Sequence, residues 1–243
     1  MRETLVLLHG FAGTRHTWDP LAARMGPKGY LPLAIDLPGH GEAAGVESPV
    51  TFAGCVEHVL ERSPERFALA GYSLGGRIAL QVALAAPERV SRLVLVSTTA
   101  GIEDPAERAE RRDSDGRLAD ELERLPYEAF IERWRAQPLF ADDPPDVVAL
   151  AEADHRRNRP HALAAALRGL GTGEMEPMWD RLGALEMPAL VLVGRRDEKF
   201  RALGARLTGL LADARLCTVP GGHVLPLESP GALARAFDGC RRV

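Results

Sequence analysis

The stretch Phe67-Ala-Leu-Ala-Gly-Tyr-Ser-Leu-Gly-Gly-Arg77 places one serine between two glycines, after a short apolar run and before a helical pattern. A serine in this context sits on a sharp strand-to-helix turn, where its hydroxyl is exposed above the first N–H groups of the helix. Gly71 and Gly75 suit the turn because a Cβ at either position would collide with neighbouring backbone. Ser73 is therefore the candidate nucleophile of this chain.

Length and composition indicate one large domain, or a domain that carries an insertion. The chain has 243 residues, of which 46% are hydrophobic, and a net charge of −4, which is sufficient for a sizeable core. Charges of both signs are interspersed and no Lys/Arg-rich block occurs, so we expect neither nucleic acid nor a membrane surface as a partner. No apolar run resembles a signal-peptide core or a membrane span of roughly 18 residues, so we expect a cytoplasmic protein.

The chain has three cysteines, an odd number, and they are widely spaced in the sequence: Cys55, Cys217 and Cys240. This spacing argues against a disulfide framework and against a zinc site. Four of the histidines also lack ligand spacing with cysteines or carboxylates: His16, His58, His155 and His161. The sequence therefore predicts no metal and no cofactor.

Short apolar runs alternate with helical patterns, which is typical of a doubly wound, mostly parallel α/β sheet. We expect buried strands at residues 5–8, 31–35, 67–70, 92–97, 189–193 and 214–219. We expect the connecting helices at residues 17–25, 51–62, 74–86, 200–211 and 231–240.

Residues 100–182 interrupt this rhythm because they contain no strand-like run. They carry helical patterns punctuated by prolines, at residues 106–124, 127–137, 145–156 and 161–170. We interpret them as a helical cap inserted into a core made of residues 1–99 and 183–243. Open α/β sheets bind ligands at the carboxyl ends of their strands, so the cap is expected to cover that edge.

A serine hydroxyl is inert at neutral pH until a base takes its proton. His223 is the candidate base because it follows the last predicted strand, in the glycine-rich loop Pro220-Gly-Gly-His223. A loop histidine at this place can reach the carboxyl edge of the sheet. A surface histidine with a purely structural role is the alternative.

The base needs a carboxylate that fixes its tautomer and stabilises the imidazolium. Asp197 follows the predicted strand 189–193 and is the first candidate, although it could instead only cap the next helix. Glu198 and Glu228 are the alternatives. The resulting order of Ser73, Asp197 and His223 is the order that follows a Gly-x-Ser-x-Gly turn in Ser-His-Asp hydrolases of this sheet type.

Negative charge that develops beside Ser73 requires fixed hydrogen-bond donors. The backbone N–H of Leu74 is one candidate, and that of Phe11 in the loop His9-Gly-Phe-Ala-Gly13 is the other. We expect His9 to brace this loop and His40 to support the turn after the second strand, rather than to act as bases.

Six motifs carry a resemblance to a known family: His9-Gly-Phe-Ala-Gly-Thr14, Asp36-Leu-Pro-Gly-His-Gly41, Gly71-Tyr-Ser-Leu-Gly-Gly-Arg77, Ala106-Glu-Arg-Ala-Glu-Arg-Arg-Asp-Ser-Asp115, Trp134-Arg-Ala-Gln-Pro-Leu-Phe140 and Gly194-Arg-Arg-Asp-Glu-Lys-Phe-Arg201. With them the chain resembles the α/β-hydrolase superfamily over nearly its full length. The last four are narrower, and with them the chain resembles the 2-succinyl-6-hydroxy-2,4-cyclohexadiene-1-carboxylate synthase family of menaquinone biosynthesis.

The resemblance implies a carbon–oxygen lyase that eliminates pyruvate from an enolpyruvyl-succinyl-hydroxycyclohexene carboxylate, with Ser73 as the proton-abstracting base. The partner is then a small polycarboxylate substrate. By position in the family motifs, five side chains should contact that substrate: Tyr72, Arg77, Arg111, Trp134 and Lys199. The family's further carboxylate-binding arginine would fall at His155, next to Arg156 and Arg157.

Several of these residues could have structural roles instead. Arg77 could bind a carboxylate of the core, Arg111 could pair with Glu107 four residues earlier, and Trp134 could belong to the cap core. The triad itself would also serve a carboxylesterase or an enol-lactonase that acts through an acyl-Ser73 intermediate.

Overall fold

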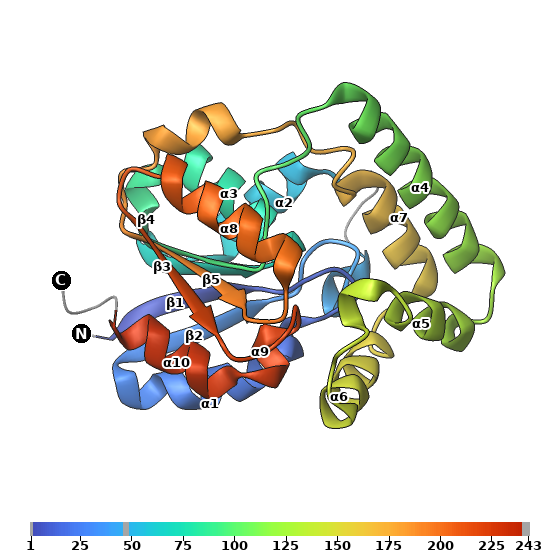
Figure 1. The fold of residues 1–243 in the computed structure, drawn as a ribbon, viewed down its shortest axis with the longest axis horizontal. Helices are drawn as coiled ribbons and strands as arrows, with labels where there is room; N and C mark the ends of the chain where they lie inside the picture. The colour runs from blue at the N-terminus through green and yellow to red at the C-terminus, as the bar shows by residue number, and fades with distance from the viewer. Residues whose placement is uncertain (1, 46–48, 240–243) are drawn as a thin grey trace.

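The computed structural model describes residues 2–45 and 49–239, so that Cys240 lies outside the described residues. Six parallel strands form one sheet in the order β2-β1-β3-β4-β5-β6 (Figure 1). They are β1 (Glu3–Leu8), β2 (Tyr30–Ile35), β3 (Phe67–Tyr72), β4 (Val90–Val96), β5 (Ala189–Gly194) and β6 (Ala214–Val219). The predicted α/β fold with a parallel sheet is confirmed.

The strands differ in burial according to their place in the sheet. Every residue of β3 and of β5 is buried, as expected for apolar runs covered on both faces. The edge strands are less covered: Leu31 in β2 is 47% exposed and Leu216 in β6 is 40% exposed. The expectation of fully buried strands is therefore wrong at both edges, because the helical layers cover the sheet edges incompletely.

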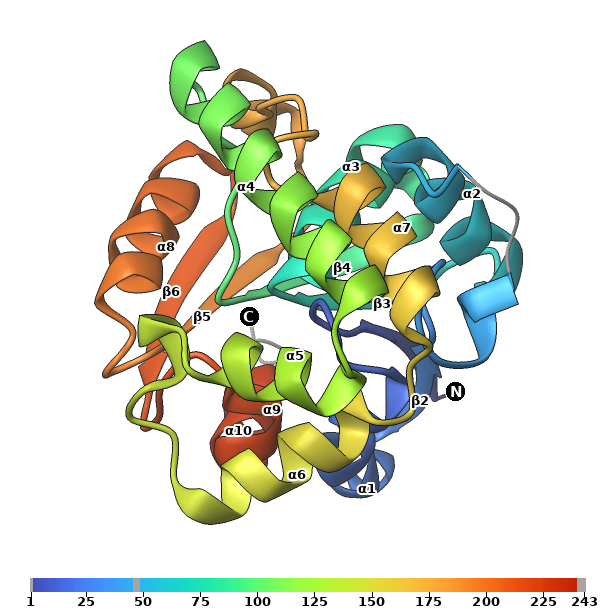
Figure 2. The same cartoon turned by 90° about the vertical axis from the view of Figure 1, so that its right-hand side faces the viewer.

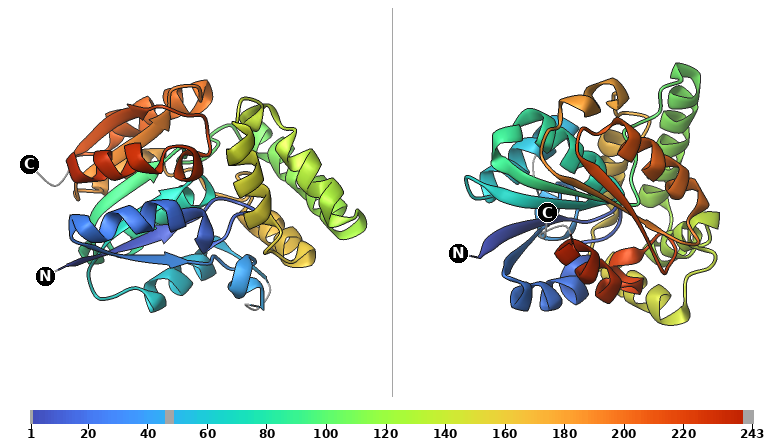
Figure 3. Two further views of the ribbon diagram at one scale, coloured as in Figure 1. Left: turned by 90° about the horizontal axis from the view of Figure 1, so that it is seen from below. Right: turned by 60° about the vertical axis from the view of Figure 1, so that its left-hand side comes forward.

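Helices cover both faces of the sheet. On one face lie α1 (Asp19–Met25) and α10 (Pro230–Gly239), side by side in the left view of Figure 3. On the other lie α2 (Phe52–Arg62), α3 (Leu74–Ala85) and α8 (Glu198–Leu210). Val6 and Leu8 of β1 belong to the core beneath α2, α3 and α8, and Leu5 and Leu7 belong to the core beneath α1 and α10. This alternation follows from the two-residue period of a strand.

Four helices between β4 and β5 form the cap: α4 (Pro105–Arg124), α5 (Tyr127–Arg135), α6 (Pro145–His155) and α7 (Pro160–Leu170). Figure 2 views the molecule from the cap side and shows these helices in front of the sheet. The cap has an apolar cluster of its own, which includes Leu122, Phe130 and Leu163. Beyond α7 the chain returns to the main core, where Trp179 Nε1 donates to the Gly101 carbonyl at 3.0 Å.

Candidate active site

Ser73 lies between the last residue of β3 and the first residue of α3, in a strained backbone conformation. Its φ is 52° and its ψ is −109°, a region that non-glycine residues rarely occupy. A Cβ on Gly71 would come within 2.2 Å of the Gly75 carbonyl oxygen, and one on Gly75 within 2.1 Å of the Leu8 carbonyl oxygen. Close backbone approach therefore requires both glycines, and it pushes the serine hydroxyl out of the turn.

His223 lies in the loop that follows β6, two residues before the short helix α9 (Leu225–Glu228). The neighbouring Gly222 N–H donates to Glu228 Oε2 at 2.7 Å, and Glu228 Oε1 accepts from Arg196 at 2.6 Å. Glu228, which the sequence offered as an alternative acid, thus braces the histidine loop instead of contacting the imidazole.

Asp197 contacts His223 and also caps a helix. His223 Nδ1 lies 2.7 Å from Asp197 Oδ2, while Asp197 Oδ1 accepts the Phe200 N–H at 3.3 Å at the start of α8. Because an ionised carboxylate only accepts, this contact places the imidazole proton on Nδ1. The other nitrogen, Nε2, lies 3.3 Å from Ser73 Oγ and is free to accept its proton.

The structure therefore brings together the three side chains of the predicted triad. Asp197 and His223 are 6% and 2% exposed, so water screens their interaction little. Glu198 is exposed and lines the adjoining pocket, without a hydrogen bond to His223 among the described contacts.

The two predicted backbone donors lie in the segments that flank Ser73. Leu74 is the first residue of α3, and Phe11 lies in the loop after β1. Among the described residues neither N–H has a protein acceptor, as expected for a helix start and for an open loop.

His9 braces the Phe11 loop, as expected. Its Nδ1 donates to the Gly10 carbonyl at 2.8 Å, and its Nε2 accepts the Leu37 N–H at 3.0 Å. Burial lowers the pKa of His9, which keeps the ring neutral and able to serve both partners. The His40 ring packs edge-on against His9 and against Phe11, which fits a supporting role.

A cavity of about 510 Å³ lies between the cap and the carboxyl edge of the sheet. Its walls include every side chain predicted for substrate binding or catalysis: Tyr72, Ser73, Arg77, Arg111, Trp134, Asp197, Lys199 and His223. Phe11, of which only the backbone N–H was expected to take part, lines the same cavity. Leu74 was also expected to take part only through its backbone, and its side chain is buried in the main core.

Arg77 is a buried cation without a carboxylate partner among the described residues. It is 7% exposed, and Nη1 donates to the Leu170 carbonyl at 2.8 Å. The alternative that Arg77 binds a core carboxylate is therefore wrong. Burial, and then the positive charge of Arg111, lower the pKa of the Arg77 guanidinium, and the negative charge of Asp115, which makes no ion pair with Arg77, opposes this shift. Such a group strongly favours an incoming anion.

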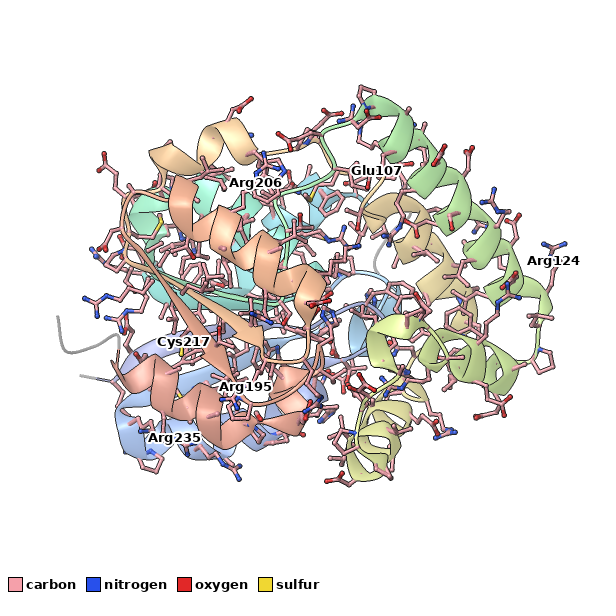
Figure 4. The ribbon with its side chains drawn as sticks, in the orientation of Figure 1. Glu107, Arg124, Arg195, Arg206, Cys217 and Arg235 are labelled. Carbon is pink, nitrogen blue, oxygen red and sulfur yellow. The ribbon has the colours of Figure 1, made fainter. Side chains whose placement is uncertain are left out.

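Arg111 pairs with Asp115, one turn later in α4, through Nε at 2.9 and 3.0 Å. The alternative in which Arg111 pairs with Glu107, a residue in the first turn of α4 (Figure 4), is wrong. Asp115 sits on the buried face of α4, and burial raises the pKa of its carboxyl group. Only Nε of Arg111 takes part in the pair, so its terminal nitrogens remain available to the cavity.

The other predicted contact residues differ in burial. The exposed Lys199 side chain carries its Nζ 6.0 Å from the Phe200 ring centroid and makes no ion pair among the described residues. Tyr72 is buried with its ring 5.3 Å from that of His223, and burial raises the pKa of its hydroxyl. Trp134 packs both on the cap cluster and on Phe11, at 4.9 Å between ring centroids, so it is cap core and pocket wall at once.

The structure does not bring the arginines beside His155 to the cavity. Arg156 pairs with Glu128 at 2.8 Å on the outside of the cap, and Arg157 lines a different cavity. His155 itself lies on a small cavity of about 30 Å³ behind the Tyr72 and Trp134 wall. Burial lowers the pKa of His155 to about 3, so it carries no charge at neutral pH.

Sequence reasoning missed a buried ion pair next to this site. Arg135 Nη2 donates to Asp143 Oδ2 at 2.6 Å, and Asp143 lines the main cavity. The two residues are eight positions apart on either side of a turn at Pro138, a spacing without a helical or strand signature.

Two further observations concern the described part of the chain only. No group of three or more histidine, cysteine or acidic side chains there is placed to hold a metal ion. None of its helices combines the length and the apolar character needed to cross a membrane.

Comparison with known proteins agrees with this architecture. A model of the alpha/beta hydrolase family matches residues 5–236. The 2-succinyl-6-hydroxy-2,4-cyclohexadiene-1-carboxylate synthase of Salmonella typhimurium strain LT2 is 34% identical, over 95% of this chain and 90% of the relative. The solved structure of MenH from S. aureus superposes with a TM-score of 0.90 at 30% identity, over 98% of this chain and 92% of that one.

An enol-lactonase structure from Burkholderia xenovorans LB400 shares the fold, with a TM-score of 0.84 at 21% identity over 100% of this chain and 92% of that one. At that identity the likeness is one of fold alone. The family match and the synthase relatives together place this chain in the α/β-hydrolase family and, within it, in the family of 2-succinyl-6-hydroxy-2,4-cyclohexadiene-1-carboxylate synthases.

Proposed function

We propose that the chain is a carbon–oxygen lyase that eliminates pyruvate from an enolpyruvyl-succinyl-hydroxycyclohexene carboxylate, and so makes 2-succinyl-6-hydroxy-2,4-cyclohexadiene-1-carboxylate. The observation that carries the proposal is Arg77. A cation that is 7% exposed, faces the cavity and lacks a carboxylate partner among the described residues suits a substrate rich in carboxylates. The synthase relatives support the same conclusion.

In the proposed reaction His223 takes the proton of Ser73 Oγ through Nε2, while Asp197 stabilises the imidazolium. The Ser73 alkoxide removes the ring proton next to the succinyl carbonyl. The electron pair shifts through the ring, the carbon–oxygen bond to the enolpyruvyl group breaks, and the leaving enolate takes the proton held by His223 to become pyruvate, which leaves Ser73 protonated and His223 neutral. No acyl-enzyme forms in this sequence.

The enolate oxygen that develops on the succinyl carbonyl is to be held by the N–H groups of Phe11 and Leu74. Fixed donors of this kind cost no reorganisation during the reaction and typically contribute about 3 kcal/mol each to lowering the barrier. Their lack of another protein acceptor among the described residues supports this role.

The substrate carboxylates are to be bound by Arg77, Arg111 and Lys199. Arginine forks match carboxylates in two-point geometry, whereas Lys199 acts as a mobile point charge at the exposed rim. Tyr72 and Trp134 then form an apolar wall beside the ring. The cavity of about 510 Å³ falls within the size range of small-molecule sites.

The alternative is a hydrolase, either a carboxylesterase or an enol-lactonase, in which Ser73 attacks a carbonyl and forms an acyl-enzyme. The 3.3 Å spacing between His223 Nε2 and Ser73 Oγ suits that chemistry equally well. The two functions differ in the role they give to Arg77. A polycarboxylate substrate supplies the buried guanidinium with a carboxylate, whereas an apolar ester has no group for it to bind.

The test supplies purified protein with the enolpyruvyl cyclohexene substrate and follows pyruvate release with lactate dehydrogenase. Hydrolysis of p-nitrophenyl acetate is measured in parallel. Rapid pyruvate release with weak ester turnover supports the lyase. Brisk ester hydrolysis without pyruvate release would favour the hydrolase, and mass spectrometry would then find the acyl group on Ser73.

A further inference from the structure

The cap holds a buried ion pair that is separated from the proposed base by one aromatic ring. The side chains of Arg135 and Asp143 are 6% and 2% exposed and lie 2.6 Å apart. Among the described residues it is the one arginine–carboxylate pair with both side chains less than a tenth exposed. Desolvation offsets much of the attraction within such a pair, so its presence is better explained by the geometry it fixes than by stability.

Arg135 reaches His223 through an aromatic ring. Its guanidinium carbon lies 4.7 Å from the centroid of the Phe140 ring, and that ring lies 6.1 Å from the imidazole of His223. Phe140 also clusters with Val224, the residue after His223. The stacked cation therefore holds the ring that packs against the base.

The side chain of Asp143 lies against the backbone of the same loop. Asp143 Oδ1 lies 3.4 Å from the position that a Cβ on Gly222 would occupy, which puts the carboxylate against the residue before His223. The neighbouring Asp142 carbonyl accepts from Arg196 at 3.4 Å, and Arg196 binds the Glu228 carboxylate that holds Gly222 N–H. The cap segment thus contacts the histidine loop in two ways: Phe140 packs on the side chains of His223 and Val224, and Asp143 lies against the backbone at Gly222.

We propose that Arg135 and Asp143 are positioning residues for His223. Their ion pair fixes cap residues 138–143 against the histidine loop and so holds the imidazole opposite Ser73. The other described rings around His223, those of Tyr72 and Phe200, come from the core. Phe140 is the ring that the cap contributes, so cap placement and base placement are coupled.

This inference rests on the proposed function only in taking His223 as the base of Ser73. Its test therefore uses a reaction that does not depend on the natural substrate, namely covalent labelling of Ser73 by a fluorophosphonate probe. Pyruvate release is measured alongside, so that kcat and KM can be separated. The variants are Arg135→Met, Asp143→Asn, the double variant and Arg135→Lys.

We expect Arg135→Met and Asp143→Asn each to slow labelling about tenfold, because small displacements of a base have large kinetic effects. In pyruvate release the loss in Arg135→Met should fall on kcat, with KM within about twofold, because Arg135 does not line the main cavity. The double variant should be no slower than either single variant, since one interaction is lost in all three. Arg135→Lys should recover most of the rate by keeping the charge.

Arg168→Met is the matched control. Arg168 also lies in the cap and binds Asp120 and Glu123, on its outer surface, so its loss should leave the labelling rate unchanged. Asp143→Asn leaves a buried cation unpaired, and if it does not fold, Arg135→Met and the double variant carry the comparison.

A folded Arg135→Met variant that is labelled within twofold of the wild-type rate would overturn the inference. Single-variant effects that multiply in the double variant would do so as well. A wild-type protein that is labelled at Ser73 but releases no pyruvate counts against the proposed function alone, because the labelling comparison stands without it.

Discussion

Asp197 accepts the Nδ1–H of His223 at 2.7 Å, and the second oxygen of the same carboxylate caps α8 by accepting the Phe200 N–H at 3.3 Å. One side chain thus joins the proposed catalytic centre to the start of a core helix. The two contacts are separable, because an asparagine can still accept at the helix end but offers His223 an N–H group where an acceptor is needed.

Asp197→Asn should therefore remove activity with little loss of stability. We expect kcat for pyruvate release to fall by about 10³-fold or more, since the imidazole is driven to the wrong tautomer. The free energy of unfolding in urea should stay within about 0.5 kcal/mol of wild type, because asparagine is as good an N-cap as aspartate. Asp197→Ala should lose the same activity and also about 1 kcal/mol of stability. More than a tenth of wild-type activity in Asp197→Asn would contradict the orienting role.

The strained backbone of Ser73 leads to a prediction about stability. With φ at 52°, a glycine at this position should relieve about 1 kcal/mol of strain. We expect Ser73→Gly to unfold at higher urea concentration than wild type and to release no pyruvate. Ser73→Ala is the matched control, because it also lacks the hydroxyl but keeps the Cβ and the strain. Equal urea midpoints for the two variants would show that the turn stores no usable strain.

Local signals made most of the fold and the triad geometry predictable from the sequence. The apolar run of β3 and the glycines at 71 and 75 define a strand, a turn and a helix within a dozen residues. Asp197 and His223 could be found because each follows a strand, and parallel strands end at a common edge. The periodicity of apolar residues and the order of strands and helices along the chain were sufficient to predict these features.

Side-chain pairing in the cap could not be predicted in the same way. Glu107 and Asp115 both lie four residues from Arg111, and the helix period alone cannot choose between them. The choice of Asp115 depends on which face of α4 packs against α7. Arg135 and Asp143 meet only because the chain turns at Pro138. The conformation of a loop leaves no repeating pattern of residues in the sequence, so this contact could not be predicted.

The unpaired charge of Arg77 leads to a prediction about substrate binding. Arg77→Met keeps the buried aliphatic stem but removes the cation, so we expect kcat/KM for pyruvate release to fall about 10²-fold, as for a lost charge-assisted contact of about 3 kcal/mol. The free energy of unfolding should rise or stay unchanged, because a desolvated charge has been removed.

Arg133→Met is the control for Arg77→Met, since Arg133 is 63% exposed and binds Glu121 on the outer face of the cap. Its kcat/KM should match that of wild type. An Arg77→Met protein that folds and releases pyruvate at the wild-type rate would remove the main support for the lyase proposal.

The buried histidines lead to a prediction about acid stability. Burial lowers the pKa of both His40 and His155 to about 3, whereas in the unfolded chain a histidine titrates near 6.5. Between these values the unfolded state binds protons that the folded state does not, so stability falls as the pH falls below about 6.5. Each histidine contributes up to about 1.4 kcal/mol per pH unit in this window.

His155→Gln should flatten that dependence. Between pH 7 and pH 5 the decrease in the free energy of unfolding, measured in urea, should be smaller than in wild type by about 2 kcal/mol. The reason is that the unfolded variant lacks the histidine that would bind one more proton than the folded state below about pH 6.5. His161→Gln, at an exposed position near the start of α7, should keep the wild-type dependence. A His155→Gln protein with the wild-type slope would mean that His155 takes up a proton in the folded state, so that the small cavity beside Arg135 tolerates a second cation.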